Sequence, residues 1–150
     1  MKHKEIQKEM QGALKSKEEV KLSVLRCLLS AFTNELVAKG KKPQDILENE
    51  EVLKVIQKEA NKRKDSIEQF TKGNRPELAD LEKKELEILE KYLPEQMSDE
   101  EIKSVVENKK AELGIEDKSK MGILIGAVMK EVQGRADGSK VKSVVESLLN

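Results

Sequence analysis

An arginine and a glutamate interrupt two apolar helical stripes, and they are the first candidates for chemistry. Between residues 49 and 70, apolar positions recur with the four–three spacing of one helix face, and Arg63 lies in the middle of them. The next stripe has Glu85 in its middle. Charged groups do not enter an apolar core without partners, so the spacing predicts a buried or half-buried ion pair between Arg63 and Glu85. The two stripes are Ile56, Ala60, Arg63, Ile67 and Phe70, and Leu78, Leu81, Glu85, Ile88 and Tyr92.

Two other interpretations of this pair remain open. Arg63 would line a cleft for an acidic ligand, or it would belong to a wider network, because Glu59, Lys62 and Glu82 lie on adjacent faces. Glu82 and Glu85 also resemble the paired carboxylates of acid–base catalysis. Carboxylates three residues apart are common on charge-rich helices, so we assign no catalytic residues here.

The stretch 134–142 combines a turn with basic side chains. Gly134 ends one predicted helix, Asp137 and Gly138 form a turn, and Ser139 is placed to cap the next helix. A helix start presents backbone N–H groups and the positive end of the helix dipole, which attract phosphate. The alternative is an ordinary loop with solvated charges. The candidate phosphate-contacting side chains are Arg135, Lys140 and Lys142.

Gly122 and Gly126 lie inside a predicted helix, where each glycine costs about 1 kcal/mol relative to alanine. Spaced four apart, they share one face and allow another backbone to approach closely. We expect this face to pack tightly within a C-terminal helical bundle; the alternative is contact with a partner helix or an RNA backbone. No Gly-Lys-Ser/Thr follows, so this is not a nucleotide-binding Walker loop.

Several constellations are missing. His3, expected at a frayed terminus, and Cys27 are the only residues of their types, so they cannot assemble a zinc site. Nothing in the sequence resembles a Ser-His-Asp or Cys-His arrangement, and we expect no metal or cofactor. Aromatic platforms for single-stranded RNA are absent. The lone cysteine and the lack of a long apolar run predict a cytoplasmic protein that does not enter a membrane.

Composition favours a helical bundle with an aliphatic core. Of the 150 residues, 39% are charged and 2% aromatic, and the apolar residues recur at helical spacing. The net charge is zero but uneven: +5 over residues 1–42, −8 over 43–117 and +3 over 118–150. The two ends are therefore the parts suited to an anionic partner, and they include a basic cluster of Lys39, Lys41 and Lys42.

The elements that position these residues are all predicted helices. We expect the first helix near residues 2–15. The second begins after a capping box formed by Ser16 and Glu19 and ends at Gly40. The remaining helices are expected at 48–71, 76–92, 99–112, 119–132 and 139–149. Pro94 disfavours helix at Leu93, and Ser98 with Glu101 forms another capping box. The predicted fold is all-α, with a larger N-terminal helical module (1–92) and a small three-helix C-terminal bundle (97–150).

Three stretches taken together resemble the GatB/YqeY family, specifically its free-standing YqeY-like members. They are the E-x-x-K-R-x-x-S-I element from Glu59 to Ile67, the E-x-x-E-L…YLP element, and the MG…GRADG…V element. The resemblance covers essentially the whole chain. The same region forms the C-terminal tail of the GatB component of the glutamine-dependent tRNA amidotransferase, in which the tail helps to hold the tRNA.

This resemblance implies a label of carbon–nitrogen ligase with glutamine as amido-N-donor. The kinase-like body of GatB and the glutaminase component of the enzyme have no counterpart in this chain, so its residues cannot carry that chemistry. The tRNA-holding role would carry over to Arg135, Lys140 and Lys142. We therefore expect a tRNA-associated binding module. The alternatives are an accessory component of an amidotransferase and a protein–protein adaptor using the face of Gly122 and Gly126.

The expected partners follow from these interpretations. They are tRNA, amidotransferase subunits or another tRNA-handling protein, whereas neither a membrane nor DNA is expected.

Overall fold

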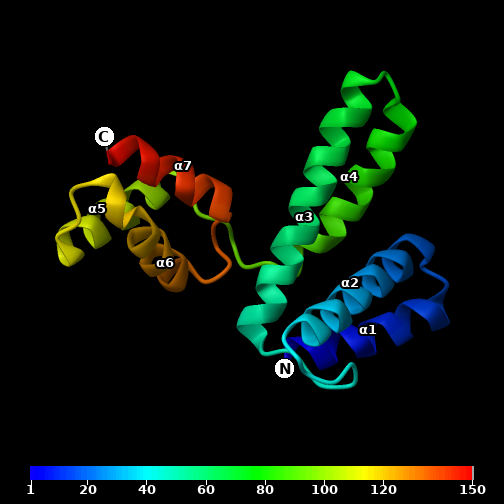
Figure 1. Ribbon diagram of the computed structural model, residues 1–150. Coiled ribbons are helices and arrows are strands. Elements are labelled where there is room, and N and C mark those ends of the chain that lie inside the picture. The colour runs from blue at the N-terminus through cyan, green and yellow to red at the C-terminus, as the bar shows by residue number, and fades with distance from the viewer. Residues whose placement is uncertain (150) are drawn as a thin grey trace. The chain divides into compact units, whose positions relative to one another are not determined.

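The described part of the chain has an all-α fold, as expected. The computed structural model describes residues 1–149, and within them the chain forms seven α-helices, one short 3₁₀ helix and no β-strand. It divides into two compact units, the first spanning Met1–Leu93 and the second beginning at Pro94. Four helices belong to the first unit and three to the second (Figure 1). No helix of the described residues combines the length and apolar character needed to cross a membrane.

The first unit consists of two helical hairpins. Helices α1 (Lys2–Ser16) and α2 (Glu19–Ala38) form one of them. Helices α3 (Asn49–Lys72) and α4 (Pro76–Glu90) form the other and lie side by side along their length (Figure 1). Pro76 occupies the first turn of α4, where its missing N–H costs no hydrogen bond. The long hairpin therefore brings the middle of α3, with Arg63, against α4.

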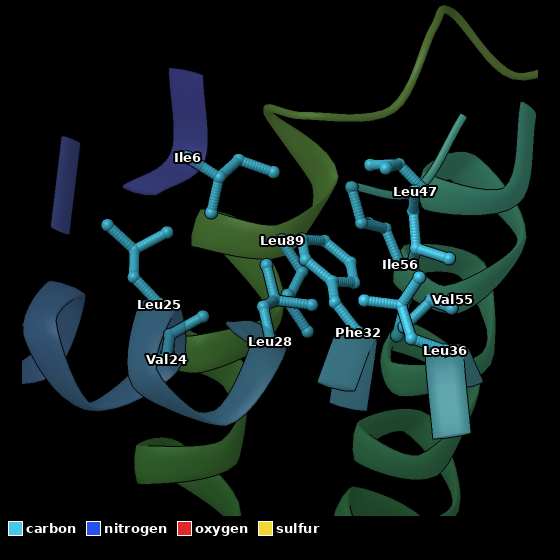
Figure 2. Close-up of a cluster of buried hydrophobic side chains, with 12 residues drawn as sticks. Ile6, Val24, Leu25, Leu28, Phe32, Leu36, Leu47, Val55, Ile56 and Leu89 are labelled. Carbon is cyan, nitrogen blue, oxygen red and sulfur yellow. The ribbon is translucent and has the colours of Figure 1, made fainter. Parts of the chain in front are cut away.

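The core of the first unit is aliphatic and centres on Phe32, which is fully buried. Figure 2 shows its ring surrounded by side chains from α2, α3 and α4. Burying such a ring and its aliphatic neighbours provides the main driving force for docking the two hairpins. The buried cluster comprises Ile6, Val24, Leu25, Leu28, Phe32, Leu36, Leu47, Val52, Val55, Ile56, Ala60 and Leu89.

Two helix starts in the first unit differ from expectation. The predicted Ser16–Glu19 capping box is wrong. Ser16 Oγ lies within hydrogen-bond distance of the Gly12 carbonyl and of Glu18 Oε2, the two acceptors open to its one proton, and Lys17 turns the chain with a positive φ of 59°. Instead, α3 begins with a capping box in which Glu48 and Glu51 accept each other's backbone N–H. Glutamate is not among the preferred capping residues, so the pattern did not reveal it.

The expectation that His3 lies at a frayed terminus is also wrong. Its side chain is only 4% exposed, and its ring packs against Phe32 with a centroid distance of 4.9 Å. Leu47, from the loop between α2 and α3, donates its backbone N–H to His3 Nδ1 at 3.0 Å. The first turn of α1 is therefore tied to a segment 44 residues away.

The second unit is a three-helix bundle with its own core. It contains α5 (Asp99–Leu113), the 3₁₀ helix Lys118–Lys120, α6 (Met121–Val132) and α7 (Gly138–Leu148). The predicted Ser98–Glu101 capping box opens α5, with Ser98 Oγ accepting the Glu101 N–H at 3.2 Å. The fully buried residues of this core are Ile102, Val106, Leu124, Val128, Val141, Val145 and Leu149.

Candidate functional site

Arg63 is the most buried cation in the first unit and has two carboxylate neighbours. Its Nη1 donates to Glu59 Oε2 at 2.6 Å, one helical turn earlier on α3. Its Nε lies 3.7 Å from Glu85 Oε2 on α4. The Arg63 side chain is 11% exposed and that of Glu85 is 18% exposed. The structure thus brings the two stripe charges together, with Glu59 as the closer partner of Arg63.

The directions of the pKa shifts show which of the two carboxylates Arg63 stabilises more. Burial works to lower the pKa of Arg63, but hydrogen bonding and charge interactions with the Cys27 sulfur in its ionised form and with the Glu59 carboxylate outweigh it and raise that pKa. The pKa of Glu85 is raised, chiefly by burial and then by Glu82, against the opposing effect of Arg63. Arg63 therefore stabilises Glu85 less than burial destabilises its charge. This arrangement suits an ion network that joins α3 to α4 more than an acid–base pair.

The turn between α6 and α7 is built by Gly134 and Asp137. Gly134 has a φ of 79°, and its carbonyl accepts a hydrogen bond from Gln96 Nε2 at 3.0 Å. The prediction that Ser139 caps α7 is wrong. The N-cap of α7 is Asp137, and its Oδ1 accepts the Ser139 N–H at 3.0 Å. A carboxylate therefore occupies the helix start, where it satisfies a donor and offsets the positive end of the helix dipole.

The three basic side chains around this turn are all exposed, but they differ in pairing. Lys140 Nζ lies 3.8 Å from Asp99 Oδ1, an exposed pair of little energetic weight. Among the described residues, neither Arg135 nor Lys142 forms an ion pair. The Arg135 backbone is held in place, because its carbonyl accepts the Met97 N–H at 2.8 Å. Arg135 on this fixed turn and Lys142 in the following helix α7 thus form no ion pair within residues 1–149 and remain available to an anion.

The N-terminal basic cluster has a different environment. Lys39 pairs with Glu51 and lies 3.6 Å from Glu35 Oε1, and the hydrogen bond to Glu51 is the largest cause of its raised pKa. Lys41 and Lys42 are exposed on the loop that follows. One of these three charges is therefore already neutralised by two carboxylates of its own unit.

The prediction that Gly122 and Gly126 pack tightly within the C-terminal bundle is wrong. Both glycines are exposed, and a Cβ added at either position would meet no atom within 4 Å. Ile123, beside them, is 63% exposed, the highest value among the large apolar side chains. The bundle buries the opposite side of α6 instead, through Leu124, Val128 and Val132. The glycine face is therefore open.

We expect Gly126→Ala to stabilise the second unit by about 0.5–1 kcal/mol. Alanine loses less backbone entropy in a helix interior than glycine does, and the open space around Gly126 accommodates the methyl group. Thermal unfolding followed by circular dichroism measures the change. Gly134→Ala is the matched control, because its φ of 79° strains any side chain and should reverse the sign. A destabilised Gly126→Ala protein would show that the face is already occupied.

Comparison with known proteins adds the following findings. The family model described as "Yqey-like protein" matches residues 3–149. An uncharacterized protein of Schizosaccharomyces pombe is 36% identical over 93 residues, which are 62% of this chain and 72% of that protein. A protein named "Altered inheritance of mitochondria protein 41, mitochondrial" from Lachancea thermotolerans is 34% identical, covering 72% of this chain and 57% of the relative. The protein of that name from Clavispora lusitaniae is 29% identical, covering 93% and 82% respectively.

Proposed function

This chain belongs to the YqeY-like protein family, and on that premise we propose that it is a tRNA-associated helical binding module without a catalytic site of its own. The observation that carries the proposal is the fixed turn between α6 and α7 together with the start of α7, where Arg135 and Lys142 respectively are exposed and form no ion pair within the described residues. Lys140, in a weak exposed pair with Asp99, extends this basic surface. We call Arg135, Lys140 and Lys142 the basic turn.

The chemistry of the second unit favours contact with phosphates over contact with bases. It contains no aromatic residue, so it has no platform on which an unstacked base would stack. Because Asp137 caps α7, the attraction comes from the side-chain charges more than from the N–H groups of the helix start. Recognition would then depend on the shape of the folded RNA and on the spacing of its phosphates.

The experiment that tests this function is a titration of labelled tRNA with the protein at several salt concentrations. About three phosphate contacts should give a slope of about −2 to −3 for log K against log salt, because each contact releases counterions. Duplex DNA of equal phosphate number is the control. If the protein recognises the shape of the folded RNA, tRNA should displace this DNA from the protein. The absence of tRNA affinity even at low salt would contradict the proposal.

A second candidate function is that of a protein–protein adaptor, and the open face of α6 favours it. Gly122 and Gly126 leave the helix backbone bare next to the exposed Ile123. Ile123→Glu should then prevent retention of a protein partner while leaving tRNA affinity intact. Recovery of amidotransferase subunits in such a pull-down would instead identify an accessory component of that enzyme.

The proposed compartment is the cytoplasm. Cys27, the single cysteine, has no intramolecular disulfide partner, which fits a reducing environment. The word "mitochondrial" in the names of two relatives marks the alternative. Fractionation of cells that carry the tagged protein distinguishes the two.

A further inference from the structure

His3 is the one histidine of the chain, and its surroundings constrain its protonation state. The side chain is 4% exposed and contacts Phe32 of α2. Its Nδ1 accepts the backbone N–H of Leu47, whose own side chain is fully buried. Because Nδ1 is an acceptor here, the neutral ring must carry its proton on Nε2.

A second hydrogen bond lies beside the first. The backbone N–H of Lys2 donates to Asn49 Oδ1 at 2.9 Å, so consecutive residues of α1 bind the loop after α2 and the start of α3. These two contacts hold the first turn of α1 in place, one turn before the buried Ile6. Among the described residues, the Leu47 N–H has no other acceptor.

Protonation of His3 is incompatible with this arrangement. In the imidazolium both ring nitrogens are donors, so Nδ1–H would point at the Leu47 N–H. The hydrogen bond would be lost, two donors would be left without acceptors, and a charge would be buried.

Among residues 1–149, no neighbouring carboxylate compensates for that charge. Within the described residues, none of the charged groups on the elements packed against His3 bonds or pairs with the imidazole, and Glu35, Lys39, Glu48 and Glu51 bond to one another. Burial is the only identified cause of the lowered pKa of His3. The charged groups in question are the N-terminus, Lys2, Lys4 and Glu5 on α1, Glu35 and Lys39 on α2, Lys41, Lys42, Asp45 and Glu48 on the loop, and Glu50 and Glu51 on α3.

We propose that the contact between His3 and Leu47 is an acid-sensitive latch, and that protonation of His3 releases the first turns of α1 from the rest of the first unit. The released segment would expose the loop around Leu47 and the apolar surface under Ile6. The latch lies wholly within the first unit and contains no residue of the basic turn, so this proposal does not rest on RNA binding.

The sign of the pH dependence follows from the direction of the shift. The pKa of His3 in the folded state lies below its ordinary value of 6.5, so the unfolded or released state binds the proton more tightly. The stabilising contribution of the latch is fully present above pH 6.5. It is lost progressively as the pH falls through the pKa of His3 in the folded state. Over that range, the equilibrium constant between the latched and the released state falls by up to tenfold per pH unit.

The test uses the full chain and two NMR readouts across mildly acidic pH. The single imidazole should titrate below pH 6.5, and hydrogen exchange of the Leu47 amide should lose protection by about tenfold or more through the same titration. The Ile102 amide in the second unit, which has no histidine, supplies the internal control and should keep its protection.

His3→Asn is the matched variant, because an asparagine Oδ1 can accept the Leu47 N–H but does not titrate. Leu47 protection in this variant should be independent of pH over the same range. Parallel loss of Leu47 protection in both proteins would overturn the latch. If the variant does not fold, measurements on the unmodified chain test the proposal by themselves. An imidazole pKa at or above 6.5, or Leu47 protection that does not change with pH, would overturn the latch.

Discussion

Replacing Arg63 with methionine is expected to lower the free energy of unfolding of the first unit by about 3–5 kcal/mol. The cost arises because removing one partner from a buried ion network leaves the other charges uncompensated. Glu59, whose side chain is 9% exposed, would lose its 2.6 Å hydrogen bond, and Glu85 would lose the cation that opposes its raised pKa. Lys62 alone would remain near Glu59, from an exposed position.

Tyr92 makes the measurement specific to the first unit, because it is the only tyrosine and the chain has no tryptophan. Urea unfolding followed by its fluorescence gives the free energy of unfolding of Met1–Leu93. Glu85→Gln should cost far less than Arg63→Met, because burial already penalises the Glu85 charge. Arg63→Met combined with Glu59→Met should recover part of the loss. Equal stability of Arg63→Met and the unmodified protein would show that the network contributes nothing.

The long-range pairing of Arg63 with Glu85 could be predicted because both residues interrupt regular apolar stripes. Helical periodicity identifies the buried face of each helix, and two interruptions on successive helices meet when the helices form a hairpin. The preference of Arg63 for Glu59 follows from a different rule, the contact between residues four apart on one helix. Periodicity alone does not rank the two carboxylates, because their relative distance depends on how closely α3 and α4 pack.

His3 shows what local patterns miss. Its burial depends on a loop residue 44 positions away, and no spacing near the terminus announces that contact. Capping was predictable at Ser98, where a preferred residue type stands three before a glutamate. The same pattern at Ser16 was misleading, because the serine hydroxyl bonds back to the carbonyl of Gly12 at the end of the preceding helix.

The candidate site was predictable in its residues but not in its detail. The glycine and basic residues of the turn stand out in the sequence, yet either Asp137 or Ser139 could have capped α7. The choice of Asp137 places a negative charge where a phosphate was expected to dock. Whether the face of Gly122 and Gly126 is open likewise depends on which side of α6 turns inward. The helix is apolar except for Lys130 and Glu131 at its end, and these are too few to mark that side.

Reversing the charge of the basic turn is expected to weaken tRNA binding at least tenfold. In the variant carrying Arg135→Glu, Lys140→Glu and Lys142→Glu, three attractive contacts become repulsive, and a tenfold change corresponds to only about 1.4 kcal/mol. Helical content should not change, because all three side chains are exposed. Filter binding at low salt measures the affinity, and circular dichroism checks the fold.

The matched control is the triple reversal of Lys39, Lys41 and Lys42 to glutamate. It changes the charge by the same amount, but Lys39 is already paired with Glu51 and Glu35, so fewer free cations are lost and the effect on tRNA should be smaller. Charge reversal at Lys39 also places a third carboxylate beside Glu35 and Glu51.

The cleaner comparison is therefore between two double variants. One carries Lys41→Glu and Lys42→Glu, and the other carries Arg135→Glu and Lys142→Glu. Equal losses from the two double variants would mean that tRNA responds to net charge and not to the basic turn. A loss confined to Arg135→Glu with Lys142→Glu would instead locate the RNA contact on the two cations that form no ion pair within the described residues. One stands on the turn whose backbone Met97 and Gln96 hold in place, and the other on α7 directly after it.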